Sequence, residues 1–246
     1  MTTRALVLGA SGATGRLLVM QLAERGIGAR ILVREGATLP EEILGNPLVE
    51  TLRGNIAGLD DAGRRRLLRD CDAVVSCLGH NPSLRGLFGE PRSLVLDAVR
   101  GMCRAVGAEA GRKVKLVLMS STACADKGAG ESYGLAERIL LSILRTLLPP
   151  HRDNARAAEC LREEFGDGNG SIEWVALRPD TLVDEACESP YDVHGSPTRS
   201  PLFDAGTTRR INVGHFMAEL LANEGLWREW RFRMPVVYDR ARQERV

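Results

Sequence analysis

Three glycines near the start of the chain, Gly9, Gly12 and Gly15, separate an apolar run from a helical pattern. The run at 4–8 predicts a buried strand, and residues 16–22 have the apolar spacing of a helix. In this order, Gly9 permits the tight turn that leaves the strand, Gly12 lets the backbone approach a pyrophosphate, and Gly15 lets the helix pack close to the sheet. The N–H groups at the start of the helix face a phosphate, whose negative charge the helix dipole favours. The pattern predicts a dinucleotide site, with a glycine-rich turn that binds no ligand as the alternative. The expected cofactor-binding residues of this turn are Gly9, Ser11, Gly12, Ala13, Thr14 and Gly15.

Short aliphatic runs alternate with helical patterns along most of the chain. The expected strands lie at residues 4–8, 29–33, 48–52, 73–78, 115–119, 172–177 and 234–238. The expected helices lie at residues 14–25, 58–69, 91–110, 131–147, 153–166 and 216–221. Strands that are apolar at nearly every position are typical of a parallel sheet covered by helices on both faces. With right-handed crossovers, the pattern predicts an α/β fold with a doubly wound parallel sheet of the Rossmann type, whose switch point lies beside the first strand.

No linker or internal repeat divides the chain, so we expect residues 1–246 to form a single NAD(P)-binding Rossmann domain. Residues 184–210 are rich in Pro, Gly, Ser, Asp and Arg and show little periodicity. A loop of this length inside a compact domain is usually functional. We therefore expect residues 184–246 to form a small, loop-rich C-terminal lobe that binds the substrate, with His194 and its surroundings as a candidate lid.

The composition excludes several classes of protein. The 246 residues carry a formal net charge of +1, which argues against a nucleic-acid surface. The six cysteines include no C-x-x-C pair and predict free, mostly buried thiols in a reducing compartment, without a metal site. The first strand begins so early that no signal peptide is expected, and the apolar stretch 135–148 contains three charges, too many for a membrane span. We expect a soluble cytoplasmic protein that contacts neither nucleic acid nor a membrane.

The end of the second strand indicates which dinucleotide binds. Arg34 stands where an acidic residue would accept hydrogen bonds from the adenosine ribose in an NAD site. Because a guanidinium can bind a 2′-phosphate through two hydrogen bonds, Arg34 favours NADP. The next residue, Glu35, keeps NAD open as an alternative, since its carboxylate can reach a ribose. Asn55, after the third strand, is a candidate contact for adenine or simply a turn residue, and Gly79, after the fourth, leaves space for the cofactor.

Several short motifs lie at or near the carboxyl ends of the expected strands within residues 3–183. They are Gly9–Gly15, Arg34, Gly54–Asn55, Gly79, Ser120–Ser121 and Arg178–Pro179. Together they resemble the atypical short-chain dehydrogenase/reductase superfamily. The nearest branch is the NAD(P)H-binding, NmrA-like group, which includes biliverdin/flavin reductase-like proteins. The resemblance implies the strand order 3-2-1-4-5-6-7, and it implies an NADPH reductase, an epimerase, or a redox sensor that binds the nucleotide without turnover.

Familiar members of that superfamily use a serine, a tyrosine and a lysine four residues after the tyrosine. Ser120 or Ser121, after the fifth strand, occupies the place of the serine, and Tyr133 follows at a suitable spacing. Position 137 is glutamate, however, and all three lysines precede Tyr133, so the chain contains no Tyr-x-x-x-Lys. A carboxylate near the phenol disfavours the phenolate by like-charge repulsion. We keep Ser121 and Tyr133 as candidate catalytic residues and assign Ser120 to the cofactor site, with a helix-start role as the alternative for Tyr133.

Two further side chains are candidates for the site. His151 lies next to the helix expected at 153–166, where the resemblance places the nicotinamide half of the site. Because an imidazole titrates near neutral pH, His151 is a candidate for proton transfer or for orienting the substrate, with a structural role as the alternative. Asp153 or Asn154 is expected to cap that helix. Arg178, after the sixth strand, either binds an anionic substrate or braces its loop.

These observations favour an NADPH-dependent reductase that transfers a hydride to a small organic or flavin-like substrate without a Tyr-Lys dyad. Flavin reduction needs little dedicated acid catalysis, so the missing dyad fits this function. The first alternative is a non-catalytic NADP(H)-binding redox sensor or regulatory protein that binds a partner protein. The second is an NADP-dependent epimerase or isomerase. The apolar helix at 135–148 is a candidate surface for a homodimer.

Overall fold

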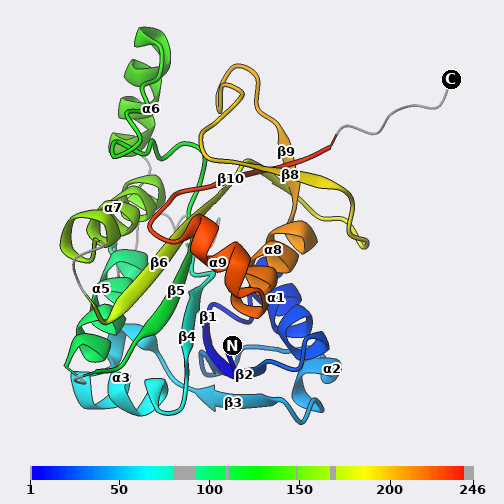
Figure 1. The fold of residues 1–246 in the computed structure, drawn as a ribbon. Coiled ribbons are helices and arrows are strands. Elements are labelled where there is room, and N and C mark those ends of the chain that lie inside the picture. The colour runs from blue at the N-terminus through cyan, green and yellow to red at the C-terminus, as the bar shows by residue number, and fades with distance from the viewer. Residues whose placement is uncertain (1, 80–91, 109–110, 148, 167–169, 241–246) are drawn as a thin grey trace, which may run out of the picture.

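The computed structural model describes residues 2–79, 92–108, 111–147, 149–166 and 170–240. Within them, a central sheet is covered by helices on both faces (Figure 1). Its strands are β1 (Arg4–Leu8), β2 (Gly28–Val33), β3 (Val49–Arg53), β4 (Ala73–Ser76), β5 (Val114–Met119), β6 (Ile172–Pro179), β8 (Tyr191–His194) and β10 (Val236–Asp239).

The strand order is β3-β2-β1-β4-β5-β6-β10-β8. Neighbouring strands run parallel, except that β8 is antiparallel to β10. The predicted doubly wound parallel sheet of order 3-2-1-4-5-6-7 is therefore confirmed, with β10 as the seventh parallel strand. The switch point lies beside β1, because the chain adds β2 and β3 on one side of it and β4, β5 and β6 on the other.

Burial on both faces explains why the strands are apolar at successive positions. In β1, Leu6 and Leu8 belong to one core cluster, whereas Ala5 and Val7 belong to the cluster on the other face. Successive side chains of a strand point to opposite faces, so a strand covered on both sides must be apolar throughout. The aliphatic runs of the sequence are thus a direct consequence of the two helical layers.

The helices form two layers. One face of the sheet carries α3 (Asp61–Leu68), α5 (Leu94–Gly107) and α7 (Pro149–Glu164), and the other carries α1 (Ala13–Glu24), α8 (Arg210–Ala222) and α9 (Glu224–Trp230). The remaining helices are α2 (Glu41–Leu44), the 3-10 turn η1 (Ile56–Gly58) and α6 (Leu135–Leu147).

Helix α6 projects from the two layers in Figure 1, and several of its apolar side chains are exposed. Leu135 is 71% and Ile139 is 55% accessible to solvent. No helix among the described residues is long and apolar enough to cross a membrane. The homodimer through this helix stays a prediction.

The C-terminal region contains more regular structure than the sequence suggests. The loop expected at 184–210 includes β8, and a separate two-stranded ribbon joins β7 (Thr181–Val183) to β9 (Thr207–Arg209). These strands have three or four residues and lack the continuous apolar run of a buried strand, because they are half-buried or exposed at most positions. They pair because the fold brings neighbouring segments of the same chain beside them, and not because of their own composition.

The cysteines and tryptophans are mostly interior. Five of the six cysteines are buried and all six are free, whereas Cys187 is exposed. Trp174, Trp227 and Trp230 are buried in the two cores, so they do not form an exposed aromatic platform. Among the described residues, no group of three or more His, Cys, Asp or Glu side chains is arranged to hold a metal ion.

The predicted cap of the helix before β6 is wrong in its detail. Helix α7 begins at Pro149, since proline is well suited to the first turn of a helix, and Asp153 therefore lies inside it. The buried carboxylate of Asp153 instead accepts hydrogen bonds from the N–H groups of Val95 (2.8 Å) and Leu96 (3.1 Å), the first turn of α5. Ser93, at the N-cap position of α5, makes no side-chain capping bond, so one helix supplies the cap of another.

We expect Asp153→Ala to lower the free energy of unfolding by about 2 kcal/mol, because two buried N–H groups lose a charged acceptor. Asp153→Asn retains one acceptor oxygen and should show a smaller loss. Urea unfolding at pH 7 measures both, with Arg156→Ala on the exposed face of α7 as the control. Equal effects of Asp153→Ala and Arg156→Ala would contradict the proposed cap.

Candidate functional site

The glycine turn after β1 is fixed by close backbone contacts. Gly9 has φ of +79°, and a Cβ built on it would lie 2.6 Å from the carbonyl oxygen of Cys77, at the end of β4. A Cβ on Gly15 would lie only 2.2 Å from the carbonyl oxygen of Gly9. Neither position accepts a side chain without movement of the backbone, so the turn and the close approach of α1 require glycine at both.

The start of α1 has the features of a phosphate site. Helix α1 begins at Ala13, and its first i→i−4 bond is donated by the N–H of Arg16 to the carbonyl of Gly12 (3.0 Å). The N-cap Gly12 is exposed and has no side chain to cap the N–H groups of the first helical turn. That turn also contains no acidic residue. The hydroxyl of buried Thr14 has no hydrogen-bond partner among the described residues. Unpaired donors at a helix N-terminus fit the pyrophosphate of a dinucleotide.

Arg34 and Asn55 lie at the same edge of the sheet, just beyond the paired strands β2 and β3. Arg34 and the adjacent Glu35 are both exposed. The side-chain oxygen of Asn55 accepts a hydrogen bond from the N–H of Ala57 (3.1 Å) and so caps η1. The turn role of Asn55 is observed, and a contact with adenine stays a prediction.

Gly79 follows β4 and is exposed. A Cβ built on it would have no heavy atom of the described residues within 4 Å, so this part of the chain leaves open space at Gly79. The residues directly after it, including His80 and Asn81, lie outside the described part of the chain.

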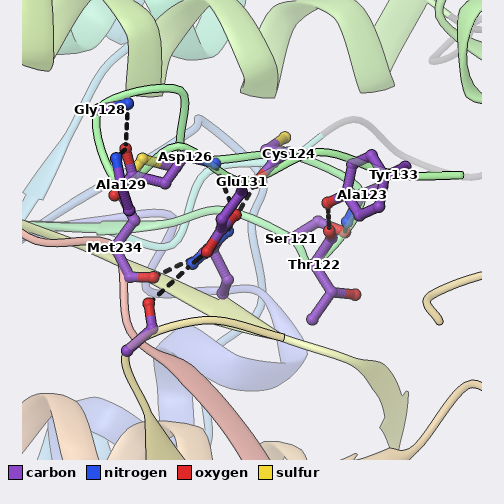
Figure 2. Close-up of polar contacts among 12 residues, drawn as sticks. Ser121, Thr122, Ala123, Cys124, Asp126, Gly128, Ala129, Glu131, Tyr133 and Met234 are labelled. Atoms are coloured by element: carbon purple, nitrogen blue, oxygen red, sulfur yellow. Dashed lines mark hydrogen bonds and ion pairs between the residues drawn. The ribbon is translucent and has the colours of Figure 1, made fainter. Parts of the chain in front are cut away.

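The serine and tyrosine candidates come together after β5. Figure 2 shows Tyr133 beside Ser121, Thr122 and Ala123. The Tyr133 hydroxyl donates to the carbonyl oxygen of Thr122 (2.5 Å), and the Ser121 hydroxyl accepts from the N–H of Ala123 (3.2 Å). Ser120 is buried, and its hydroxyl has no partner among the described residues. The phenol proton is thus committed to a backbone carbonyl, and Glu137 stands four residues later, where the familiar dyad has its lysine.

Glu137, four residues after Tyr133, is buried on α6 and accepts a hydrogen bond from the hydroxyl of Ser200. This contact joins α6 to the loop between β8 and β9. His151 is half-buried in the first turn of α7, two residues before the Asp153 cap. Its role in proton transfer stays a prediction.

Arg178, at the end of β6, is fully buried and uses all of its donors within the protein. Its two Nη atoms bind the Glu131 carboxylate at 2.6 and 2.8 Å. The same guanidinium donates to the carbonyl oxygens of Met234 (2.6 Å), Cys124 (3.0 Å) and Gly195 (3.2 Å). A guanidinium has five N–H donors, so none is left for an anionic substrate. Of the two roles predicted for Arg178, the structure supports the brace.

No sequence motif points to Glu131, the ion-pair partner of Arg178. Burial alone would raise the pKa of its carboxyl, but the bonds from Arg178 and from the N–H of Asp126 (2.7 Å) outweigh burial and hold that pKa below its ordinary value. Figure 2 shows Glu131 within the loop that also contains Cys124 and Asp126. The ion pair therefore holds this loop against the carboxyl end of the sheet.

Asp180 fixes the other end of the loop that follows β8. It accepts hydrogen bonds from the N–H groups of Thr181 (2.8 Å) and Gly206 (3.0 Å), and burial raises the pKa of its carboxyl. Gly206 is itself confined, since a Cβ on it would lie 2.6 Å from the Tyr238 ring. Gly195 is bound by Arg178 and Gly206 by Asp180, so the loop 195–206 is tied at both ends to the end of β6. His194, predicted in the lid, is half-buried beside this loop.

The fold and the glycine turn define a dinucleotide-binding protein of the Rossmann type. The family model described as NAD(P)H-binding matches residues 9–224, and the chain belongs to this family. No curated protein matches the sequence.

Solved structures share the fold at low sequence identity. A short-chain dehydrogenase/reductase from Veillonella parvula, solved in complex with NADP, is 15% identical, with 97% of this chain and 95% of that chain covered and a TM-score of 0.68. A candidate NADH-flavin reductase from Streptococcus pneumoniae is 13% identical, with 97% and 100% covered and a TM-score of 0.67. A candidate NAD-dependent epimerase/dehydratase from Bacillus halodurans is 18% identical, with 97% and 94% covered and a TM-score of 0.66.

We expect Glu131→Gln to lower the free energy of unfolding by about 3 kcal/mol at pH 7, because it leaves the buried Arg178 without a countercharge. The lowered pKa of Glu131 contributes stability above the unfolded value, and this contribution is lost as the pH falls through the folded pKa. The difference between wild type and Glu131→Gln should therefore shrink below about pH 4.

Urea unfolding between neutral pH and acid measures this difference. Glu229→Gln, an exposed carboxylate on α9, is the control and should change little. A difference that does not depend on pH would contradict an ionised Glu131 as the partner of Arg178.

Proposed function

We propose that this protein is an NADPH-dependent reductase that reduces a small organic or flavin-like acceptor without a Tyr-Lys dyad. The observation that carries the proposal is the open, uncapped start of α1, with Arg34 beyond the adjacent strand at the same edge of the sheet. Membership of the NAD(P)H-binding family supports the nucleotide, and the exposed guanidinium supports the 2′-phosphate.

The residues near the end of β5 support an acceptor that needs little acid catalysis. NADPH, when bound, supplies a hydride, and reduction of a flavin also consumes one proton. The Tyr133 hydroxyl donates a hydrogen bond to the carbonyl oxygen of Thr122, and the Ser121 hydroxyl accepts one from the N–H of Ala123, so neither is arranged as an activated acid. Proton delivery from solvent, or from Ser121 or His151 after movement, is sufficient for such an acceptor.

The glycine turn and the guanidinium of Arg34 would bind different phosphate groups of the cofactor. The N–H groups from Ala13 to Gly15 hold the pyrophosphate, and the buried Thr14 hydroxyl offers a further donor. Arg34 holds the 2′-phosphate at the far end. Ser120, whose buried hydroxyl has no described partner, is assigned to the nicotinamide half of the site.

A redox sensor is the second candidate, and one specific observation favours it. Two polar side chains near the ends of β5 and β6 are occupied by internal bonds: Tyr133 with Thr122, and Arg178 with Glu131. Such a site can bind the nucleotide and transmit its presence to a partner protein without turnover. Binding of NADPH is common to both candidates, and only oxidation separates them.

We expect Arg34→Ala to raise the KM for NADPH about tenfold or more and to leave the KM for NADH little changed, because a bidentate bond to the 2′-phosphate is lost. Initial rates with both nucleotides measure the change, or binding titrations if turnover is absent. Arg228→Ala, an exposed arginine on α9, is the control. Equal effects on the two nucleotides would remove the case for NADP.

We expect saturable oxidation of NADPH when purified protein is mixed with a panel of flavins, quinones and carbonyl compounds. The absorbance of the reduced nicotinamide measures it, and flavins should be the best acceptors. His151→Ala and Ser121→Ala test proton delivery, with Arg152→Ala as the neighbouring control. Tight NADPH binding without oxidation by any acceptor would favour the sensor and contradict the reductase.

A further inference from the structure

A basic hollow lies at the opposite edge of the sheet from the glycine turn. Asp72 directly precedes β4, and Arg112 lies two residues before β5, so the hollow is at the amino ends of these strands. Figure 1 shows α3 at this lower edge of the molecule. The cavity has a volume of about 530 Å³, within the range of small-ligand sites. Its lining residues are Ala62, Arg65, Arg66, Arg69, Asp70, Asp72 and Arg112.

One arginine of the hollow is held in place and shapes its wall. The guanidinium of Arg112 donates to the carbonyl oxygens of Leu68 (2.5 Å) and Cys71 (2.6 Å). Leu68 is the last residue of α3, so Arg112 also satisfies the negative end of that helix. These two bonds hold the positive charge of Arg112 in the wall of the cavity.

The other three arginines, Arg65, Arg66 and Arg69, are exposed, and within the described residues no carboxylate forms an ion pair with them. Of the two carboxylates in the described lining, Asp72 is bonded away from these three arginines. Asp72 accepts bonds from the N–H (2.8 Å) and hydroxyl (2.5 Å) of Thr3, and its carboxyl has a lowered pKa, although partial burial acts in the other direction. Among the described residues that line it, the cavity thus has four guanidinium groups and two carboxylates.

The lining also excludes other kinds of ligand. Ala62 is the one apolar side chain among the described lining residues, so an apolar molecule would gain little from burial against them. A guanidinium presents paired N–H donors that match the oxygens of phosphate. Three such groups on flexible side chains and one fixed group suit a small anion with several charges.

We propose that this hollow binds a compact, multiply charged phosphate anion, with Arg65, Arg66 and Arg69 closing on it beside the fixed positive charge of Arg112. The site is separate from the nucleotide site at the other edge of the sheet and does not depend on the proposed reductase function. Local charge, and not the net charge of +1 for the chain, determines the attraction.

Calorimetric titration with pyrophosphate tests the proposal. Because the start of α1 can also bind this probe, the informative quantity is the difference between wild type and Arg65→Gln/Arg69→Gln. We expect wild type to bind one more pyrophosphate than the double variant, or to bind it about tenfold more tightly at that site. Arg228→Gln on α9 is the matched control and should behave as wild type. Identical titrations for wild type and the double variant, or an equal loss in Arg228→Gln, would overturn the proposal.

A second measurement needs no variant. Phenylglyoxal modifies exposed arginines, and peptide mass spectrometry locates the modified residues. Pyrophosphate should protect Arg65, Arg66 and Arg69 and leave Arg228 reactive. Absence of protection would overturn the proposal, as would protection of these residues by duplex DNA but not by pyrophosphate.

Discussion

The buried ion pair of Arg178 and Glu131 organises the carboxyl edge of the sheet. A guanidinium removed from water is stable only when its charge and all of its donors are satisfied. Here the acceptors come from the loop after β5, from the loop after β8 and from Met234, two residues before β10. The pair therefore connects segments that are distant in the sequence, and the shape of the substrate side depends on it.

The sequence predicts the sheet well because burial on both faces leaves a strong local signal. Each of the seven parallel strands appears as an apolar run within two residues of its observed bounds. The short strands β7, β8 and β9 carry no such run, since their pairing depends on other segments of the same chain that lie beside them. The helix expected at 153–166 begins earlier, at Pro149, because proline fits a first helical turn.

The candidate site likewise contains some residues that the sequence predicts and others that it does not. Gly9 and Gly15 are predictable because backbone geometry within one turn demands glycine, and the demand is visible in the sequence as a spacing. Glu131 lies 47 residues before Arg178, and no motif fixes that interval. Asp153 caps a helix that starts almost sixty positions earlier, which a rule about adjacent residues cannot find. Contacts between residues so far apart in the sequence become visible only in the folded structure.

The position of β10 has a consequence for how the chain is made. This strand lies between β6 and β8, although β8 precedes it in the sequence. During synthesis on the ribosome, β6 emerges before β10 and keeps one side open until residues 236–239 leave the exit tunnel. β8 likewise waits for its neighbour, which is β10. The sheet is thus completed only when β10 is available, and a nascent chain stalled before Val236 would present an unfinished sheet edge to chaperones and proteases.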